Sequence, residues 1–189
     1  MNVTLEPFSF GREDKKWLKK LFLSAFPRVE RPPFWVFVRM RPPKAALWLI
    51  RADGQKAGFF SVLPGRGLAY VYLFAVDDAL RGRGIGSSAL RQLCSLYEGK
   101  LFLAIEPLMP EAPNYFVRVR RKAFYERNGF TYLHQWIRES GETYSLLGIG
   151  EPVPEKGYLS LMRSGLGLLA FRIVRPAIGP GDAEALLRP

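Results

Sequence analysis

The sequence predicts a mixed α/β fold, with a mostly antiparallel central sheet that contains one parallel pair of strands and is flanked by helices. Two apolar runs, at 45–51 and 56–63, flank a turn whose Asp-Gly pair suits a tight hairpin. A proline-glycine turn then leads to a third apolar run at 68–76. A helical pattern and a further strand at 101–105 follow, and such a unit normally forms a right-handed parallel crossover.

The elements before this meander are predicted from periodicity. A short strand is expected at 2–5. An amphipathic helix follows, because apolar residues recur at helical spacing before a proline: Trp17, Leu18, Leu21, Phe22 and Ala25. The segment 34–40 lies between two proline pairs and suits a short helix or a strand about equally.

The second half of the chain contains two further helices and a hairpin. One helix should start near Ile85 and end at Gly99, and another should run from Asn114 to a stop at Gly129. Residues 130–137 and 143–149, joined across Ser140-Gly141, predict a final hairpin. We expect one domain over 1–150. The extension 151–189 is expected to pack on that domain or to be partly flexible, with a membrane-surface or partner contact through Arg163, Arg172 and Arg175 as the alternative.

Composition limits the class of protein. A chain of 189 residues with 48% hydrophobic content can bury one sizeable core. No apolar stretch reaches the roughly 18 residues that a transmembrane helix needs, and the first ten residues do not resemble a signal peptide, so we expect a cytoplasmic protein. With one cysteine and one histidine, no protein-built metal site is expected.

The net charge of +11 raises the question of nucleic-acid binding. The basic residues are scattered along the chain, however, and the densest cluster, Arg118 with 120–122, lies on a predicted helix where it could meet cofactor phosphates. Nucleic acid is therefore not expected as the principal partner.

A glycine-rich turn at 81–86 follows the strand at 68–76 and opens a helix. Glycines let a backbone approach a ligand closely, and the free N–H groups of the first helical turn favour a phosphate. The spacing G-x-G-x-G fits neither a dinucleotide fingerprint nor a P-loop.

Two motifs carry a resemblance to a known family. The pattern Arg81-x-x-Gly84-x-Gly86, preceded by 73–77, resembles the acyl-CoA signature of the GNAT superfamily of N-acetyltransferases. Downstream, residues 123–130 resemble that superfamily's second signature, a helix that carries a tyrosine and ends in Gly-Phe. The resemblance covers roughly residues 12–149. The chain is also similar to bacterial members of the superfamily in having a strand that ends in Glu-Pro.

The resemblance implies a GNAT-like acyl-CoA N-acyltransferase fold in which the parallel strands splay apart to admit the pantetheine arm of acetyl-CoA. Backbone groups at the end of one splayed strand would pair with that arm. N–H groups of the glycine turn would hold the pyrophosphate, and two arginines would add charge. The implied cofactor-binding residues are Phe74, Ala75, Val76, Arg81, Gly82, Arg83, Gly84, Ile85, Gly86 and Ser87.

The resemblance also implies two catalytic residues. Tyr125 occupies the position of the tyrosine that protonates or contacts the CoA sulfur, the alternative being a core tyrosine. Glu106 ends the strand 101–105 and is a candidate base, the alternatives being an anchor for the substrate ammonium or a solvated strand end; Glu111 is the next candidate. Where many members carry an asparagine that contacts CoA, this chain has Arg118.

The implied activity is transfer of an acetyl group from acetyl-CoA to a primary amine of a small molecule or peptide, by direct attack in a ternary complex. Two alternatives stay open: a catalytically silent acyl-CoA-binding or regulatory module and, less favoured, a basic nucleic-acid-binding protein. The acceptor amine is not encoded in any pattern we can interpret. A homodimer also stays open.

Overall fold

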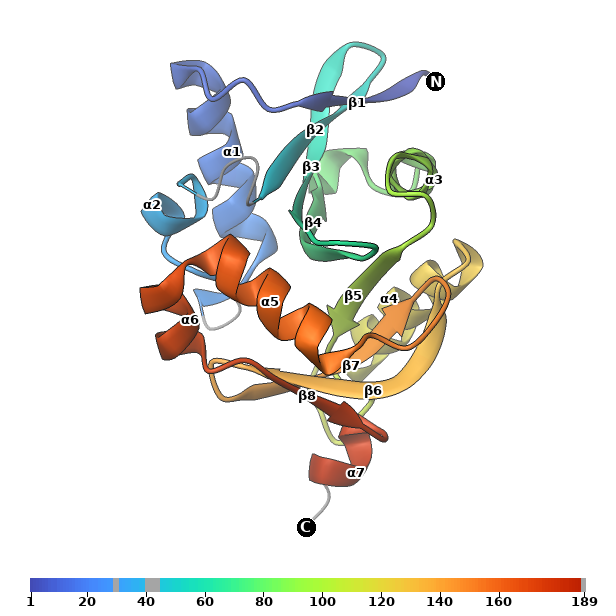
Figure 1. Cartoon of the computed structure of the whole chain (residues 1–189). Helices are drawn as coiled ribbons and strands as arrows, with labels where there is room; N and C mark the ends of the chain where they lie inside the picture. Colours follow the sequence, from blue (N-terminus) through green and yellow to red (C-terminus); the bar gives the residue numbers. More distant parts are fainter. Residues whose placement is uncertain (29–30, 40–44, 188–189) are drawn as a thin grey trace. The chain divides into compact units, whose positions relative to one another are not determined.

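The computed structural model describes residues 1–28, 31–39 and 45–187. The chain divides into two compact units: Met1–Leu63 with Val71–Leu96, and Pro64–Tyr70 with Tyr97–Pro189. The predicted mixed α/β fold is confirmed, because each unit combines a sheet with helices (Figure 1).

The sheet of the first unit has the order β1-β2-β3-β4. Its strands are β1 (Val3–Pro7), β2 (Ala46–Ala52), β3 (Gln55–Pro64) and β4 (Ala69–Val76). β2 pairs with both β1 and β3 in antiparallel fashion. The predicted hairpin is confirmed: Asp53 and Gly54 turn the chain between β2 and β3 with φ angles of 48° and 79°.

Three helices cover this sheet, with α1 and α2 on one side and α3 on the other (Figure 1). Their bounds are α1 (Arg12–Ala25), α2 (Phe34–Phe37) and α3 (Ile85–Leu96), and a short 3₁₀ helix, η2 (Asp78–Leu80), precedes α3. Within segment 34–40 the helix alternative is confirmed over Phe34–Phe37; Met40 lies outside the described residues. An aromatic core holds this side together, since the Phe37 ring stacks on Phe22 with centroids 4.7 Å apart and contacts Phe59 at 5.8 Å.

The sheet of the second unit has the order β5-β7-β6-β8, with antiparallel neighbours throughout. Its strands are β5 (Leu101–Ile105), β6 (Thr131–Glu139), β7 (Glu142–Gly148) and β8 (Ala177–Pro180). The predicted final hairpin is confirmed as β6 and β7. Residues 177–180 of the C-terminal extension form β8, which pairs with β6 at the edge of this sheet.

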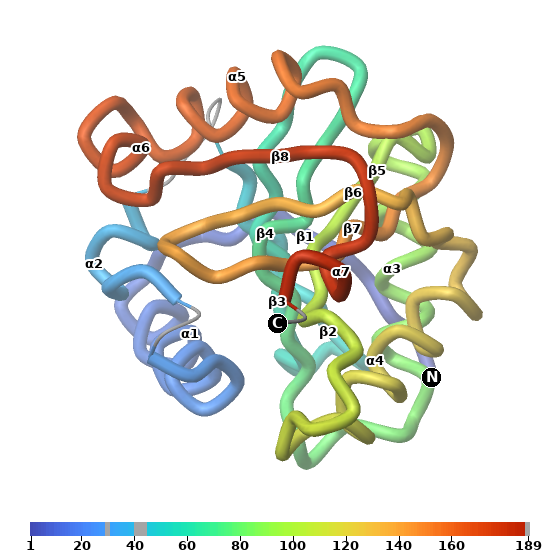
Figure 2. The backbone as a smooth tube through the Cα atoms, turned by 90° about the horizontal axis from the view of Figure 1, so that it is seen from below, coloured from blue at the N-terminus to red at the C-terminus, as the bar shows by residue number. Residues whose placement is uncertain are grey.

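Helices α4 (Tyr115–Arg127) and α5 (Glu155–Leu166) lie on opposite sides of the second sheet (Figure 2). The chain then continues through α6 (Leu168–Val174), β8 and α7 (Ala183–Leu187). Tyr158 anchors α5, because its side chain is fully buried and its ring meets the edge of Phe102.

The start of β4 belongs to the second unit. Ala69 donates its N–H to the carbonyl of Lys100 at 2.8 Å, and the Tyr70 ring stacks on Phe102 with centroids 4.8 Å apart. Both β4 and β5 start at this contact and run from it in the same direction, so their first residues form the predicted parallel pair.

Candidate active site

In the first unit, the glycine-rich turn joins the end of β4 to α3. Gly82 and Gly84 both have φ angles of 78°, which favour glycine strongly. A Cβ built on either residue would meet no atom within 4 Å, so the space above the turn is open. Glycine is therefore required here by backbone conformation rather than by a nearby protein group.

The first turn of α3 presents free backbone donors. Ser88 N–H bonds to the Gly84 carbonyl at 3.0 Å and is the first intrahelical bond, so the N–H groups of residues 85–87 precede the helical ladder. The buried side chain of Ile85, 2% exposed, fixes this end of the helix in the core. The start of α3 therefore has the donors and the dipole that the predicted anion site requires.

The two arginines of the turn differ. The Arg81 guanidinium already has partners in its own chain, because it lies 2.7 Å from the Asp78 carboxylate and donates a hydrogen bond to the Val76 carbonyl at 3.3 Å. Arg83 is exposed and makes no ion pair with any described residue. Of the two, Arg83 is the one whose charge is available to a phosphate.

The end of β4 depends on a glycine that sequence reasoning missed. A Cβ on Gly58 in β3 would lie 2.3 Å from the carbonyl oxygen of Ala75 and 3.1 Å from Cα of Val76. Only glycine lets β3 approach β4 this closely, with Phe74 stacked on Phe60 beside it at 4.2 Å. The available signal was an isolated glycine inside a strand pattern.

In the second unit, Tyr125 lies on α4 and is 9% exposed. Its ring contacts Phe124 and Phe130 edge-on, at centroid distances of 5.2 and 5.8 Å. Burial raises the pKa of Tyr125 to about 12, although the positive charge of Arg121 acts in the opposite direction. The phenol therefore keeps its proton at neutral pH.

Glu106, just after β5, is also buried, with 9% of its surface exposed. Asn114 donates to one carboxylate oxygen at 2.8 Å, and Arg118 lies 3.2 Å from the same oxygen. Arg121 binds the other oxygen. Arg118 also donates to the Asn114 side chain at 2.7 Å and to the Pro107 carbonyl at 2.8 Å, which completes a cluster of four side chains.

Arg121 connects the two predicted catalytic residues of this unit, because it pairs with Glu106 and its charge acts on Tyr125. Arg118 and Arg121 thus bind a carboxylate of their own chain. Glu111, the second candidate base, is exposed. Sequence reasoning missed this cluster, although the spacing of Asn114, Arg118 and Arg121 on one helical face was a usable signal.

A further carboxylate, Glu184 on α7, binds the segment after Glu106. It accepts a hydrogen bond from the Leu108 N–H at 2.7 Å, and the hydroxyls of Ser145 and Tyr132 donate to it at 3.3 Å each. The C-terminal extension therefore holds the loop that begins at Pro107. Nothing in the sequence pattern of the extension indicated this role.

Known proteins share a domain and the fold with this chain. Residues 43–132 match the family model of the acetyltransferase (GNAT) domain. No curated protein sequence gives a match. Among solved structures, a protein from Bacteroides thetaiotaomicron assigned to the GNAT family is 22% identical, with a TM-score of 0.64 over 78% of this chain and 87% of that one.

Two other solved structures share the fold. The ribosomal-protein-S18-alanine N-acetyltransferase of Escherichia coli is 18% identical, with a TM-score of 0.59 over 81% of this chain and 96% of its own. A GNAT family acetyltransferase from Elizabethkingia anophelis with acetyl-CoA bound is 15% identical, with a TM-score of 0.55 over 78% and 97%. The matching domain over residues 43–132 and the shared fold support membership of the GNAT superfamily.

Proposed function

We propose that the protein is an N-acetyltransferase that moves an acetyl group from acetyl-CoA to a primary amine, by direct attack of the amine on the thioester. The observation that carries this proposal is the open glycine turn at the start of α3, with Gly82 and Gly84 at positive φ. Such a turn fits a pyrophosphate, which needs close backbone approach and several N–H donors. The neighbouring GNAT structure with bound acetyl-CoA supports the choice of cofactor.

Different residues would bind different parts of acetyl-CoA. Backbone N–H groups of 82–87 would hold the pyrophosphate, with Arg83 adding charge. Backbone groups at the end of β4, from Phe74 to Val76, would pair with the amides of the pantetheine arm. Gly58 belongs to this set as a positioning residue, because it keeps that stretch of β4 in place.

The chemistry requires a neutral amine and a stabilised leaving thiolate. Acetyl-CoA supplies an activated acyl group whose thiolate leaves as the C–N bond forms. A thiol has a pKa of about 8.5, so a phenol with a pKa of about 12 would give up its proton to the thiolate only at a cost of roughly 5 kcal/mol. We therefore assign Tyr125 a hydrogen bond to the departing sulfur. Water would first take one proton from the alkylammonium, and the neutral nitrogen, which becomes cationic as the C–N bond forms, would then give a second proton to the sulfur.

The side chains that bind Glu106 decide between its possible roles as a base, an ammonium anchor or a positioning residue. As a base it would have to accept a proton while both of its oxygens bind cationic side chains. As an anchor for an ammonium it would bring a third cation beside Arg118 and Arg121. We propose that Glu106 is a positioning residue that holds Arg121 next to Tyr125, and that water takes the amine proton.

A panel of amines tests the proposed transfer. Release of free thiol from acetyl-CoA would be followed with peptides that have free N-termini, aminoglycosides, polyamines and amino-acid derivatives. We expect at least one class to raise thiol release well above the rate without amine, together with a product that has gained one acetyl group. Saturable acetyl-CoA binding without transfer to any amine would favour the silent acyl-CoA-binding module instead.

A further inference from the structure

One side of α6 exposes an unusual set of side chains. Leu168, Leu169 and Ile173 are 52%, 75% and 70% exposed. Together with Arg172 they occupy positions i, i+1, i+4 and i+5, which lie on one side of a helix. We call this set the α6 face. Single exposed apolar side chains are common on protein surfaces, but a contiguous group of three large ones is typical of an interaction site.

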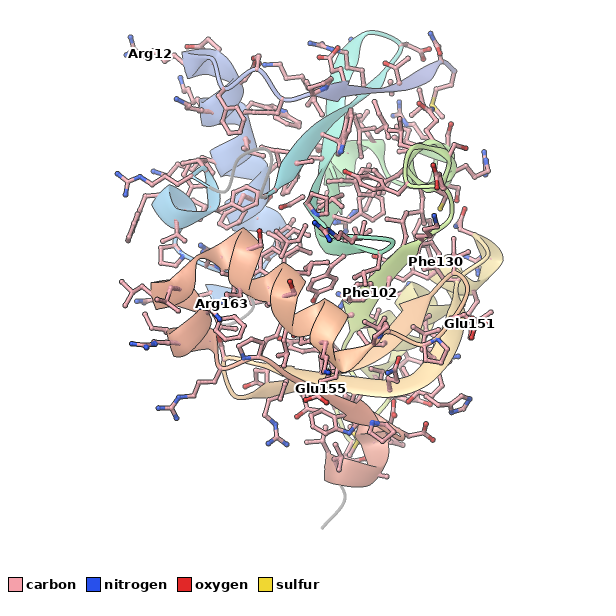
Figure 3. The ribbon with its side chains drawn as sticks, viewed as in Figure 1. Arg12, Phe102, Phe130, Glu151, Glu155 and Arg163 are labelled. Atoms are coloured by element: carbon pink, nitrogen blue, oxygen red, sulfur yellow. The ribbon has the colours of Figure 1, made fainter. Side chains whose placement is uncertain are left out.

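The segment that carries the α6 face is cationic. Arg163 on α5 and Arg175 after α6 are both exposed. Residues 156–181 contain four cationic residues, one lysine and three arginines, and no aspartate or glutamate. Figure 3 shows Arg163 on the part of α5 that approaches α6. A partner that covers the α6 face therefore has to be both apolar and anionic.

The α6 face is held rigidly. Gly167, with a φ angle of 78°, separates α5 from α6 and donates to the Arg163 carbonyl at 3.1 Å. At the other end, Ser140 donates its N–H to the Val174 carbonyl at 2.8 Å, and the chain continues into β8. Both ends of α6 are thus fixed to the second unit while the α6 face stays uncovered by the described residues.

We propose that the α6 face docks on an anionic membrane surface. Leucine and isoleucine side chains would enter the boundary between headgroups and acyl chains, and the arginines would pair with lipid phosphates. No described helix is long and apolar enough to cross a membrane, so α6 would lie in the plane of the interface. This inference is independent of the proposed transferase activity.

Two other partners fit the same face less well. A second copy of the chain, related by a twofold axis, would bring Arg172 and its neighbours against the same arginines. Nucleic acid would satisfy the arginines but would leave Leu169 and Ile173 without an apolar partner. An anionic lipid surface satisfies both kinds of side chain at once.

Sedimentation with vesicles tests the proposal. The full chain would be mixed with vesicles of phosphatidylcholine and phosphatidylglycerol in equal parts, or of phosphatidylcholine alone. We expect binding to the anionic vesicles only, weakened by salt. Leu169→Ser with Ile173→Ser should lower the partition coefficient at least tenfold, and Arg172→Gln with Arg175→Gln about tenfold.

Matched variants separate this face from general charge and hydrophobicity. Leu96→Ser changes an exposed leucine of the first unit, 53% exposed, and Lys19→Gln with Lys20→Gln removes two exposed charges from α1. Both controls should bind as the unchanged protein does, and circular dichroism checks that every variant is folded. No binding to anionic vesicles, equal loss in the controls, or self-association that the α6 variants abolish would each overturn the proposal.

Discussion

At the scale of single residues, the second unit places a neutral phenol and an ion-paired carboxylate around one guanidinium. Arg121 binds Glu106 and lies one helical turn before Tyr125. Its charge opposes the effect of burial on the tyrosine pKa. A substitution at Tyr125 should therefore lower the turnover number, and a substitution at Glu106 should lower the free energy of unfolding.

Tyr125→Phe removes the hydroxyl and keeps the buried ring. We expect the turnover number to fall about 100-fold, because the departing sulfur loses its hydrogen bond, while acetyl-CoA affinity changes less than about threefold. Steady-state kinetics with an amine from the panel, together with calorimetry, measure the two quantities. A variant with normal turnover would remove Tyr125 from the mechanism.

Glu106→Gln leaves Arg118 and Arg121 without their anion. The side chain of Arg118 is 18% exposed, so we expect the free energy of unfolding to fall by about 2–3 kcal/mol in urea titrations. The matched control is Glu98→Gln, which breaks an exposed pair with Lys100 and should leave the free energy of unfolding almost unchanged. Equal effects of the two substitutions would argue against the buried cluster.

At the scale of secondary structure, two close contacts set the positions of strands. Gly58 in β3 lets the end of β4 approach, and the Tyr158 hydroxyl on α5 donates to Glu139 on β6 at 2.8 Å. Burial raises the pKa of Glu139 to about 7, although hydrogen bonds from Tyr158 and Tyr70 act in the opposite direction. Each contact predicts a measurable effect.

Gly58→Ala forces the backbone at Ala75 and Val76 to move, because a backbone atom cannot yield as a flexible side chain can. We expect acetyl-CoA to bind at least tenfold more weakly to a folded variant. Gly11→Ala is the control, since its Cβ would meet no atom closer than 3.7 Å. Unchanged binding by Gly58→Ala would separate β4 from the cofactor.

Glu139 makes stability depend on pH. The folded state keeps the proton until about pH 7, whereas the unfolded chain loses it near the ordinary glutamate pKa of about 4.3. The unfolded state therefore binds fewer protons in this window, and stability falls as the pH rises from about 5 to 8, by roughly 2 kcal/mol. Urea titrations should show this fall for the natural chain and a flatter profile for Glu139→Gln; parallel profiles would contradict it.

At the scale of the whole molecule, the fold was predictable because the turns between its strands and helices are determined by local sequence. The Asp-Gly turn and the glycines before α3 fix their conformations by their own backbone preferences. The cluster around Glu106 was missed because Arg118 and Arg121 look in sequence like a solvated basic helix face, although their spacing from Asn114 was a signal. β8 was missed because its four residues include glycine and proline and have no periodicity. The roles expected for Tyr125, Glu106 and the glycine turn stay predictions.

Calorimetric titration with acetyl-CoA would show whether the glycine turn binds the cofactor. The titration compares the natural chain with Gly84→Ala and Gly54→Ala. The two glycines have φ angles of 78° and 79° and open surroundings, so both substitutions carry the same backbone strain, but Gly54 lies in the β2-β3 hairpin. We predict saturable binding by the natural chain and by Gly54→Ala, and a loss of at least tenfold in affinity for Gly84→Ala. No binding by the folded natural chain, or equal binding by all three proteins, would contradict the assignment of the glycine turn to acetyl-CoA.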